Sequence, residues 1–416
     1  MSSLPDLSLK MIAIERGVTM VMDLASELAR PDRMPAENVP LTESMHRILR
    51  EDVVADADSP RFDKAIRDGF AVRFEGLSTI PVDLQIIGES RAGHSAAPGT
   101  NVTPSTCCEI MTGAALPPGA NAVVMVEHTE RLSPDRVRIL RTSREGEGLM
   151  RQAAEMREGD RILHSGKRIL LADIGTLASV GKSTVVVSRR PRVAILATGD
   201  ELVEVREHPD SSRIRNSNSY SLHAQVTEAG AEPVMLGIAR DDLADLREKI
   251  RLGLEHDIVL VSGGVSMGKY DFVEDVFAEF GVKVLFDQVA MKPGKPTVFG
   301  HRGDTFVFGL PGNPVSTMVA FRMFVRPLIL KLLKSEVTAS MELEAQLEVA
   351  TRRDSARTAI IPALVRFEGR RYRIRTAPWK GSSDLAGLSR ANALVMIPQG
   401  EGMIEAGEWV QFFPFE

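Results

Sequence analysis

Residues 257–281 read DIVLVSGGVSMGKYDFVEDVFAEFG, and the pattern of side chains changes sharply in the middle of this stretch. Residues 257–263 are an apolar run typical of a buried strand, which stops at Ser262-Gly263-Gly264. Residues 272–281 have the apolar spacing of an amphipathic helix that ends at a glycine. Glycines at the end of a buried strand indicate that another group comes close to the backbone. The stretch therefore predicts a strand, a loop able to hold a ligand and a helix.

The same alternation of strand and helix extends on both sides of this stretch, over residues 191–334. Further strands are predicted at 193–199, 234–239, 282–290 and 305–310. Further helices are predicted at 216–230, 241–254 and 315–333. Apolar strands that alternate with amphipathic helices predict a doubly wound, mostly parallel sheet.

The rest of the chain has a different texture and predicts additional domains, as expected for 416 residues. Helices are predicted at 17–31 and 42–50, and short β-type runs separated by Gly/Pro turns are predicted at 82–89, 107–113 and 121–130. The predicted fold is multidomain α/β plus β. Its parts are a discontinuous mixed α/β domain (18–53 and 159–190), a β-rich insert (54–158), a central α/β domain (191–335) and a small C-terminal β domain (336–416).

Composition excludes several classes of function. The net charge of −5 gives no reason to expect a nucleic-acid partner. No stretch approaches the roughly 20 apolar residues needed to span a membrane, and the N-terminus does not resemble a secretory signal. Cys107 and Cys108, the only cysteines, are adjacent in an apolar run and cannot join distant segments. They predict buried, reduced thiols in a cytoplasmic protein.

Loops that follow the predicted strands contain the residues best suited to bind a ligand. These loops are Thr198–Glu201, Asp241–Asp242, Ser262–Ser266 and Pro311–Pro314. In an open α/β sheet, ligands bind beyond the carboxyl ends of the strands, where backbone N–H groups and hydroxyls suit an anion. Carboxylates beside an anion favour a bridging Mg²⁺, and Lys292 and Lys295 in MKPGKP lie nearby in sequence. Each loop alone could be a plain turn with a helix-capping acid, but together they favour a binding site.

The sequence lacks two common nucleotide-binding motifs. Residues 175–183, GTLASVGKS, resemble a P-loop, but five residues separate Gly175 from Gly181 where the motif has four. The predicted order is also reversed, with a helix before the GKS and a strand after it. No G-x-G-x-x-G follows a strand, and neither a metal-binding histidine spacing nor a Ser/His/Asp nucleophile arrangement is visible.

Longer motifs resemble a known family. ATGDEL (197–202), SGGVSMGKYD (262–271), MKPGKPTVFG (291–300) and GLPGNPVS (309–316) occur in the order found in the molybdopterin molybdenumtransferase family, which includes MoeA and the E domain of gephyrin. PRFDKAIRDGFAV (60–72), IMTGAALPPGANAVVMVEHT (110–129) and GSSDLAGLSRANALVMIP (381–398) resemble other segments of that family. The resemblance covers the chain from about residue 18 to its end.

The resemblance implies an elongated homodimer whose subunits insert molybdate into adenylylated molybdopterin, releasing AMP and forming the molybdenum cofactor with Mg²⁺ or a similar ion. A molybdopterin-adenylylating protein would act upstream, and molybdoenzymes would accept the product. The site would lie between subunits, with the central sheet of one chain facing the β-insert of the other.

The site residues implied by the resemblance fall into three groups. The catalytic residues would be Asp68, which would reach the partner's cleft, together with Asp241, Asp271 and Lys292. The metal ligands would be Glu155, Glu201, Asp241 and Asp271. The residues that bind molybdopterin, its phosphate or the adenylate would be Thr198, Gly199, Ser262, Gly263, Gly264, Ser266, Lys295, Pro311, Gly312, Asn313 and Pro314.

The sequence departs from the family pattern at a few positions. Ala153-Ala154-Glu155 stands where Gly-Glu-Asp is usual, and Arg151 comes one position late. Gln288 replaces a common basic residue, and Ala65 replaces a frequent serine. These changes favour an alternative, in which the chain is a molybdopterin-binding paralogue or scaffold with altered or lost turnover. A second alternative is tungstate in place of molybdate.

Overall fold

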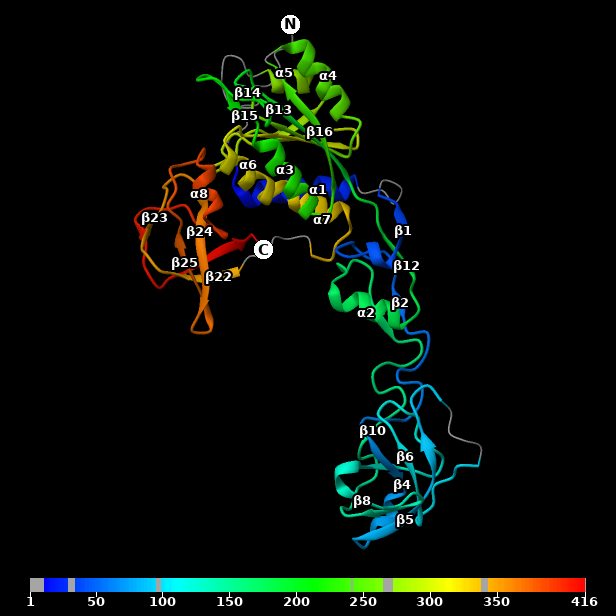
Figure 1. Ribbon diagram of the computed structural model, residues 1–416. Coiled ribbons are helices and arrows are strands. Elements are labelled where there is room, and N and C mark those ends of the chain that lie inside the picture. The colour runs from blue at the N-terminus through cyan, green and yellow to red at the C-terminus, as the bar shows by residue number, and fades with distance from the viewer. Residues whose placement is uncertain are drawn as a thin grey trace.

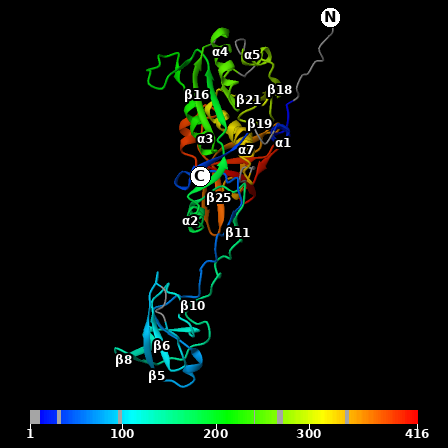
Figure 2. The ribbon, with the colours of Figure 1, turned by 90° about the vertical axis from the view of Figure 1, so that its right-hand side faces the viewer.

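The computed structural model describes residues 11–28, 34–94, 99–240, 242–264, 272–337 and 343–415. The chain is elongated (Figure 1), with the β-insert at one end and the central sheet with its helices at the other. Figure 2 shows that only two chain segments connect the β-insert to the remainder of the molecule. Among the described residues, no helix is long and apolar enough to cross a membrane.

The central unit is a six-stranded sheet in the order β16-β13-β17-β21-β20-β18. Its strands are β13 (Arg192–Thr198), β16 (Glu232–Ala239), β17 (Ile258–Ser262), β18 (Lys283–Phe286), β20 (Val298–Arg302) and β21 (Thr305–Leu310). Strands β16, β13, β17 and β21 pair in parallel, whereas β20 is antiparallel to both of its neighbours. The predicted doubly wound, mostly parallel sheet is therefore confirmed, although β20 was not predicted.

Helices cover both faces of this sheet. One face carries α1 (Ile14–Glu27), α3 (Asn218–Glu228), α6 (Pro314–Ala320), the π-helix η4 (Phe321–Val325) and α7 (Arg326–Leu332). The other face carries α4 (Leu243–Gly253) and α5 (Val273–Glu279). Each face has its own hydrophobic core, which explains why the strands are apolar throughout and do not alternate. The predicted helix 315–333 is present, with one π-helical turn inside it.

A small mixed unit connects the central unit to the β-insert. It contains β1 (Ala36–Pro40) paired with β12 (Thr184–Ser188), β2 (Val53–Val54) paired with β11 (Arg161–Leu163), and α2 (Leu171–Ser179). The predicted helix 42–50 is wrong, because only Leu41–Glu43 form a short 3₁₀ turn, η1. Ile48 and Leu49 instead form bridges with Arg168 and Val187 in extended backbone. Pairing with distant segments buries these two side chains and overrides the local helical spacing.

The β-insert is built on a six-stranded sheet in the order β7-β4-β6-β5-β9-β8. Its elements are β3 (Lys64–Ala65), β4 (Gly69–Val72), η2 (Phe74–Leu77), β5 (Val82–Ser90), β6 (Thr106–Ile110), β7 (Ala122–Met125), η3 (Val126–His128), β8 (Thr129–Ser133), β9 (Arg136–Ile139) and β10 (Leu149–Met150). Cys107 and Cys108 lie on β6 and are fully buried, as predicted. Burial raises the pKa of the Cys107 thiol to about 12 and that of Cys108 to about 11, so neither is a reactive thiolate.

The C-terminal unit is built on a third six-stranded sheet, in the order β19-β24-β25-β22-β28-β26. Its elements are β22 (Leu343–Leu347), β23 (Thr351–Arg352), β24 (Thr358–Glu368), β25 (Arg371–Thr376), α8 (Leu385–Ser389), β26 (Ala393–Ile397), β27 (Met403–Ile404) and β28 (Trp409–Pro414). Strand β19 (Met291–Lys292) comes from the MKPGKP segment and pairs in parallel with β24. This pairing joins the lysine-containing loop to the C-terminal sheet.

Candidate active site

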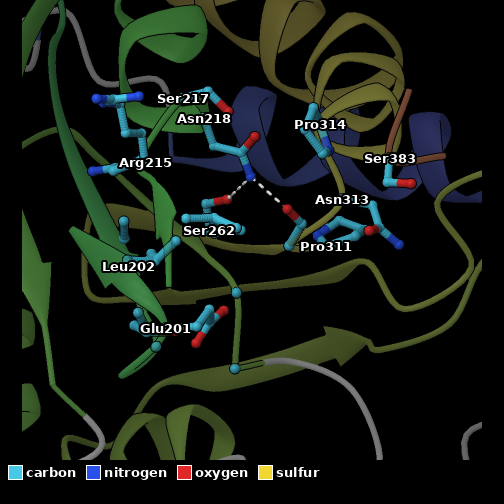
Figure 3. A pocket seen from close by; sticks show the side chains of 18 of the residues that line it. Glu201, Leu202, Arg215, Ser217, Asn218, Ser262, Pro311, Asn313, Pro314 and Ser383 are labelled. Atoms are coloured by element: carbon cyan, nitrogen blue, oxygen red, sulfur yellow. Dashed lines mark hydrogen bonds between the residues drawn. The ribbon is translucent and has the colours of Figure 1, made fainter. Parts of the chain in front are cut away.

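An open pocket of about 670 Å³ lies at the carboxyl ends of the central strands. It is lined by the loops after β13, β17 and β21, by the start of α3 and by part of the C-terminal unit (Figure 3). The lining residues include Thr198, Gly199, Glu201, Ser262, Gly263, Gly264, Pro311, Gly312, Asn313 and Pro314. The structure therefore brings together the residues of three of the predicted loops, because parallel strands end at one edge of a sheet.

The glycine loop after β17 leaves no room for side chains at its turn. Gly263 has φ +97°, in the left-handed region, and a Cβ there would lie 2.6 Å from the carbonyl oxygen of Thr198. Its N–H donates to the carbonyl of Leu310 at 3.0 Å. The loop thus packs its backbone directly against the ends of β13 and β21. This close approach is the physical reason for the glycine that the sequence shows.

The loop after β21 starts helix α6 and contacts the C-terminal unit. The N–H of Thr317 donates to the carbonyl of Asn313 at 3.0 Å, and the N–H of Val315 donates to the carbonyl of Ser382 at 3.0 Å. Ser383 and Leu385 from the same segment line the pocket. The pocket is therefore shared between the central sheet and the C-terminal unit.

The loop after β13 carries Glu201, whose carboxylate belongs to the pocket lining (Figure 3). The short parallel pair β14 (Leu202–Val203) and β15 (Ile214–Arg215) follows it. A guanidinium nitrogen of Arg240, at the end of β16, donates to the carbonyl of Leu202 at 3.1 Å. This bond fixes the backbone next to Glu201.

The start of α3 contributes pocket residues that the sequence reading did not identify as a site. Arg215, Asn216, Ser217 and Asn218 line the pocket. The amide nitrogen of Asn218 donates to Ser262 Oγ at 2.9 Å and to the carbonyl oxygen of Gly312 at 2.7 Å (Figure 3). The polar NSNS run at 216–219, which begins the predicted helix 216–230, is the signal in the sequence for these pocket residues.

Lys292 lies at the boundary of the central and C-terminal units, where its ammonium group is 3.0 Å from Asp354 Oδ2. Asp354 Oδ1 also accepts from the backbone N–H of Ala356 at 3.0 Å. The hydrogen bond from Lys292 is the main reason that the pKa of Asp354 lies below its usual value. Pro296 of the same MKPGKP segment lines the pocket, whereas Lys292 and Lys295 are not among the lining residues. Contact of either lysine with an anion remains a prediction.

Asp68 lies in the β-insert, directly before β4. Its Oδ1 accepts from the backbone N–H of Thr112 at 2.6 Å and from the Thr112 hydroxyl at 2.8 Å. These hydrogen bonds, the backbone one first, lower the pKa of Asp68, so it stays ionised well into the acidic range. Figure 1 shows β4 at the opposite end of the chain from β13 and α6. A single chain therefore does not place Asp68 in the pocket.

Glu155 also lies away from the pocket, on a segment that connects the mixed unit to the β-insert. Its Oε2 accepts from Ser59 Oγ at 2.6 Å, and its Oε1 lies 3.7 Å from the Lys64 ammonium. No group of three or more His, Cys, Asp or Glu side chains that could hold a metal occurs in the described part of the chain. Asp241, Ser266 and Asp271 lie outside the described residues, so their predicted roles remain predictions.

Ala153, in the segment that departs from the family pattern, has φ +59°. A non-glycine residue in this region is strained by roughly 1–2 kcal/mol, because its Cβ approaches the following carbonyl. We expect Ala153→Gly to raise the free energy of unfolding by about 0.5–1 kcal/mol, after the entropic cost of glycine is subtracted. Calorimetry would measure the shift, with Ala154→Gly as the matched control. A destabilisation by Ala153→Gly as large as that of the control would contradict the strain.

Comparison with known proteins covers nearly the whole chain. Residues 13–181 match the model of the MoeA N-terminal region (domain I and II), residues 194–331 a probable molybdopterin binding domain, and residues 344–415 the MoeA C-terminal region (domain IV). A molybdopterin molybdenumtransferase of Bacillus subtilis is 35% identical over 383 residues, covering 90% of this chain and 89% of that protein. One of Nostoc sp. is 34% identical, covering 96% and 92%.

Solved structures show the same architecture. A molybdopterin biosynthesis MoeA protein from Pyrococcus horikoshii superimposes with a TM-score of 0.78 at 30% identity, covering 98% of this chain and 100% of that one. A second structure of MoeA from that organism gives a TM-score of 0.83 at 28% identity, with the same coverage. The chain therefore belongs to the molybdopterin molybdenumtransferase family.

Proposed function

We propose that this protein is a molybdopterin molybdenumtransferase, which inserts molybdate into adenylylated molybdopterin, releases AMP and forms the molybdenum cofactor. The observation that carries the proposal is the pocket. Backbone loops from three strand ends and a segment of the C-terminal unit converge there, within a chain that resembles such enzymes over almost its full length. The pocket is open, is lined by both polar and apolar groups, and is large enough for an extended substrate.

The residues of the pocket suit the cleavage of a phosphoanhydride. The glycine loops let a ligand approach the backbone closely, and the Ser262 hydroxyl adds a donor for phosphate oxygens. Charge that develops on the leaving AMP requires such preorganised donors and positive charge. Lys292 and Lys295 would supply the positive charge at the edge of the site. Molybdate would provide the attacking oxygen, so no protein nucleophile is required.

The donor set fits Mg²⁺ held mainly by the substrate. Mg²⁺ in phosphate chemistry is commonly bound by one or two carboxylates, water and the phosphates themselves. Glu201 offers one carboxylate in the pocket, and Asp241 and Asp271 are the further candidates from the sequence. When bound, the ion would neutralise phosphate charge. Glu155 is engaged with Ser59 and Lys64, which makes it the least suitable of the proposed ligands.

We propose that the complete site forms between two copies of the chain, with Asp68 of one facing the pocket of the other. Apolar side chains near Asp68 in the sequence and fold support this arrangement. Phe62, Ile66, Met111 and Val126 are 44%, 39%, 36% and 52% exposed. The N–H of Val126 donates to the Asp68 carbonyl, and Met111 precedes the Thr112 that holds the Asp68 carboxylate. Exposed apolar groups around a fixed carboxylate favour a face that is covered by a partner.

The experiment that tests the function is an assay of AMP release. Purified protein would be incubated with adenylylated molybdopterin and Mg²⁺, with or without molybdate, and AMP would be followed by chromatography. We expect AMP release to depend on molybdate, and tungstate in a parallel reaction would test selectivity between the oxyanions. Tight binding of adenylylated molybdopterin without molybdate-dependent AMP release would contradict the proposed enzyme and indicate a binding paralogue. A molybdoenzyme acceptor would be tested afterwards by transfer of the product.

A further inference from the structure

Asn218 has a side-chain orientation that the fold determines. Its Nδ2 lies 2.7 Å from the Gly312 carbonyl oxygen, 2.9 Å from Ser262 Oγ and 3.3 Å from Thr317 Oγ1. A carbonyl oxygen can only accept, so the NH₂ end of the amide must face Gly312. A flipped amide would place two acceptors together at that distance. Asn218 therefore connects three elements: the β17 loop, the β21 loop and α6.

The hydrogen bonds of Asn218 determine which donors and acceptors of the β17 and β21 loops are available to a ligand. One amide hydrogen occupies the Gly312 carbonyl, which would otherwise repel an anion. The other is accepted by Ser262 Oγ, so the Ser262 hydroxyl proton must point elsewhere. No described residue accepts that proton, and Ser262 lines the pocket. Asn218 thus turns Ser262 into a donor toward the ligand.

Thr317, in helix α6, also provides hydrogen bonds to the carbonyls of the β21 loop. Its hydroxyl is buried and shares its one proton between the carbonyls of Pro311, which is the closer, and Asn313 in the β21 loop. Its oxygen lies 3.3 Å from Asn218 Nδ2, farther than the two acceptors that take the amide hydrogens. The carbonyls of Pro311, Gly312 and Asn313 all have donors from within the protein. These three carbonyls are therefore less available to repel an anion in this part of the pocket.

The missing hydrogen-bond partner of Asn218 Oδ1 in the described part of the chain supports this interpretation. Within the described residues, this buried oxygen has no hydrogen-bond partner. A buried acceptor without a partner typically costs roughly 1–3 kcal/mol and requires an explanation. The NH₂ end has strong contacts while the oxygen end has none. Such an arrangement is expected where the residue is kept for its donors.

We propose that Asn218 is a positioning residue that occupies the Gly312 carbonyl and orients the Ser262 hydroxyl as a donor, and so favours phosphate-type oxyanions in this part of the pocket. Its amide hydrogens go to the Gly312 carbonyl and to Ser262 Oγ, which leaves the Ser262 hydroxyl proton to the ligand. The inference rests on the proposed function, because it concerns the groups that would hold the phosphate of the adenylylated substrate. It predicts that loss of the amide weakens binding of the charged group and has little effect on the uncharged remainder.

The test compares AMP with adenosine, which lacks the phosphate. Dissociation constants of both would be measured by titration calorimetry for the wild type and for Asn218→Leu and Asn218→Ala. Both substitutions are neutral, so no charge is added to the site. We expect the preference for AMP over adenosine to fall about 10-fold in Asn218→Leu, the size of effect expected for hydrogen bonds to a charged group. Adenosine affinity should change less than 3-fold.

Two further variants distinguish a role of Asn218 in anion binding from a purely structural role. Gln225→Ala removes another amide from α3, outside the pocket, and should leave the preference unchanged. Ser262→Ala removes the oriented hydroxyl and should lower the preference several-fold, even if the Asn218 variants fold poorly. A purely structural role of Asn218 would weaken AMP and adenosine equally.

The outcomes separate this inference from the proposed function. A wild type without preference for AMP would overturn the anion site itself, and with it both proposals. A wild-type preference that survives unchanged in Asn218→Leu or in Ser262→Ala would overturn only the role of Asn218. Loss of preference in both variants would support it, whatever the turnover assay shows.

Discussion

Replacement of Asp68 by alanine is expected to lower the rate of molybdate-dependent AMP release by about 10²–10³-fold, the usual effect of removing a positioned acid or base. The fold should be unaffected, because the carboxylate is at the surface of the β-insert and is bonded only to Thr112 among the described residues. Those two bonds hold it ionised and in one orientation, as a group that acts on a substrate must be. Initial rates under saturating molybdate would measure the effect.

The matched control is Asp83→Ala, which removes another exposed carboxylate from the same β-insert. Asp83 forms an ion pair with Arg138 at 2.7 Å across strands β5 and β9, neither of which pairs with β4, the strand that follows Asp68. We expect this variant to retain normal turnover. A normal rate in Asp68→Ala, or an equal loss in Asp83→Ala, would contradict the role of Asp68.

Mixing experiments test whether Asp68 acts in a partner's pocket. Asp68→Ala would be co-expressed with Glu201→Gln, so that mixed dimers contain one site with both residues intact. In a shared site, the mixture should recover activity that neither variant has alone. No recovery would indicate that each chain uses its own Asp68, which the separation seen in Figure 1 makes hard to achieve.

Gly263→Ala is expected to lower the free energy of unfolding by about 2–4 kcal/mol and to abolish detectable AMP binding. Left-handed backbone strains an L-residue by roughly 1–2 kcal/mol, and Gly263 has φ +97°. Its Cβ would also lie 2.6 Å from the Thr198 carbonyl oxygen, so the loop or the end of β13 must move. Such a shift displaces the Ser262 hydroxyl, which would donate to the phosphate.

Gly312→Ala is the matched control for stability. Gly312 has no left-handed φ, and the nearest atom to its added Cβ would be the Gly263 Cα at an ordinary 3.6 Å. We expect its unfolding free energy to change by less than about 0.5 kcal/mol, as for substitutions without a steric conflict. Denaturant titration of both variants would measure the difference. Equal stability of the two would show that the β17 loop adjusts easily.

The sequence predicted the central sheet well, because the features that identify its strands lie within each strand and the residues next to it. The runs around β13, β17 and β21 are apolar throughout and stop at glycine or proline, which identifies buried parallel strands and the loops beyond them. The predicted helix 42–50 failed for the opposite reason. Ile48 and Leu49 have helical spacing, yet they pair with Arg168 and Val187, more than a hundred residues away in the chain. Local periodicity carries no signal of such a partner.

The residues of the candidate site also fall into those that the sequence predicts and those that only the tertiary structure brings together. The sequence by itself determined the doubly wound sheet and the loops at its edge, because strand ends and glycine turns follow from the order of neighbouring residues. Only the tertiary structure decided that Asn218 ties these loops together, that Lys292 pairs with Asp354, and that Asp68 and Glu155 lie away from the pocket of their own chain. Hydrogen bonds and ion pairs between distant segments depend on distances that folding sets. No run of residues encodes them locally.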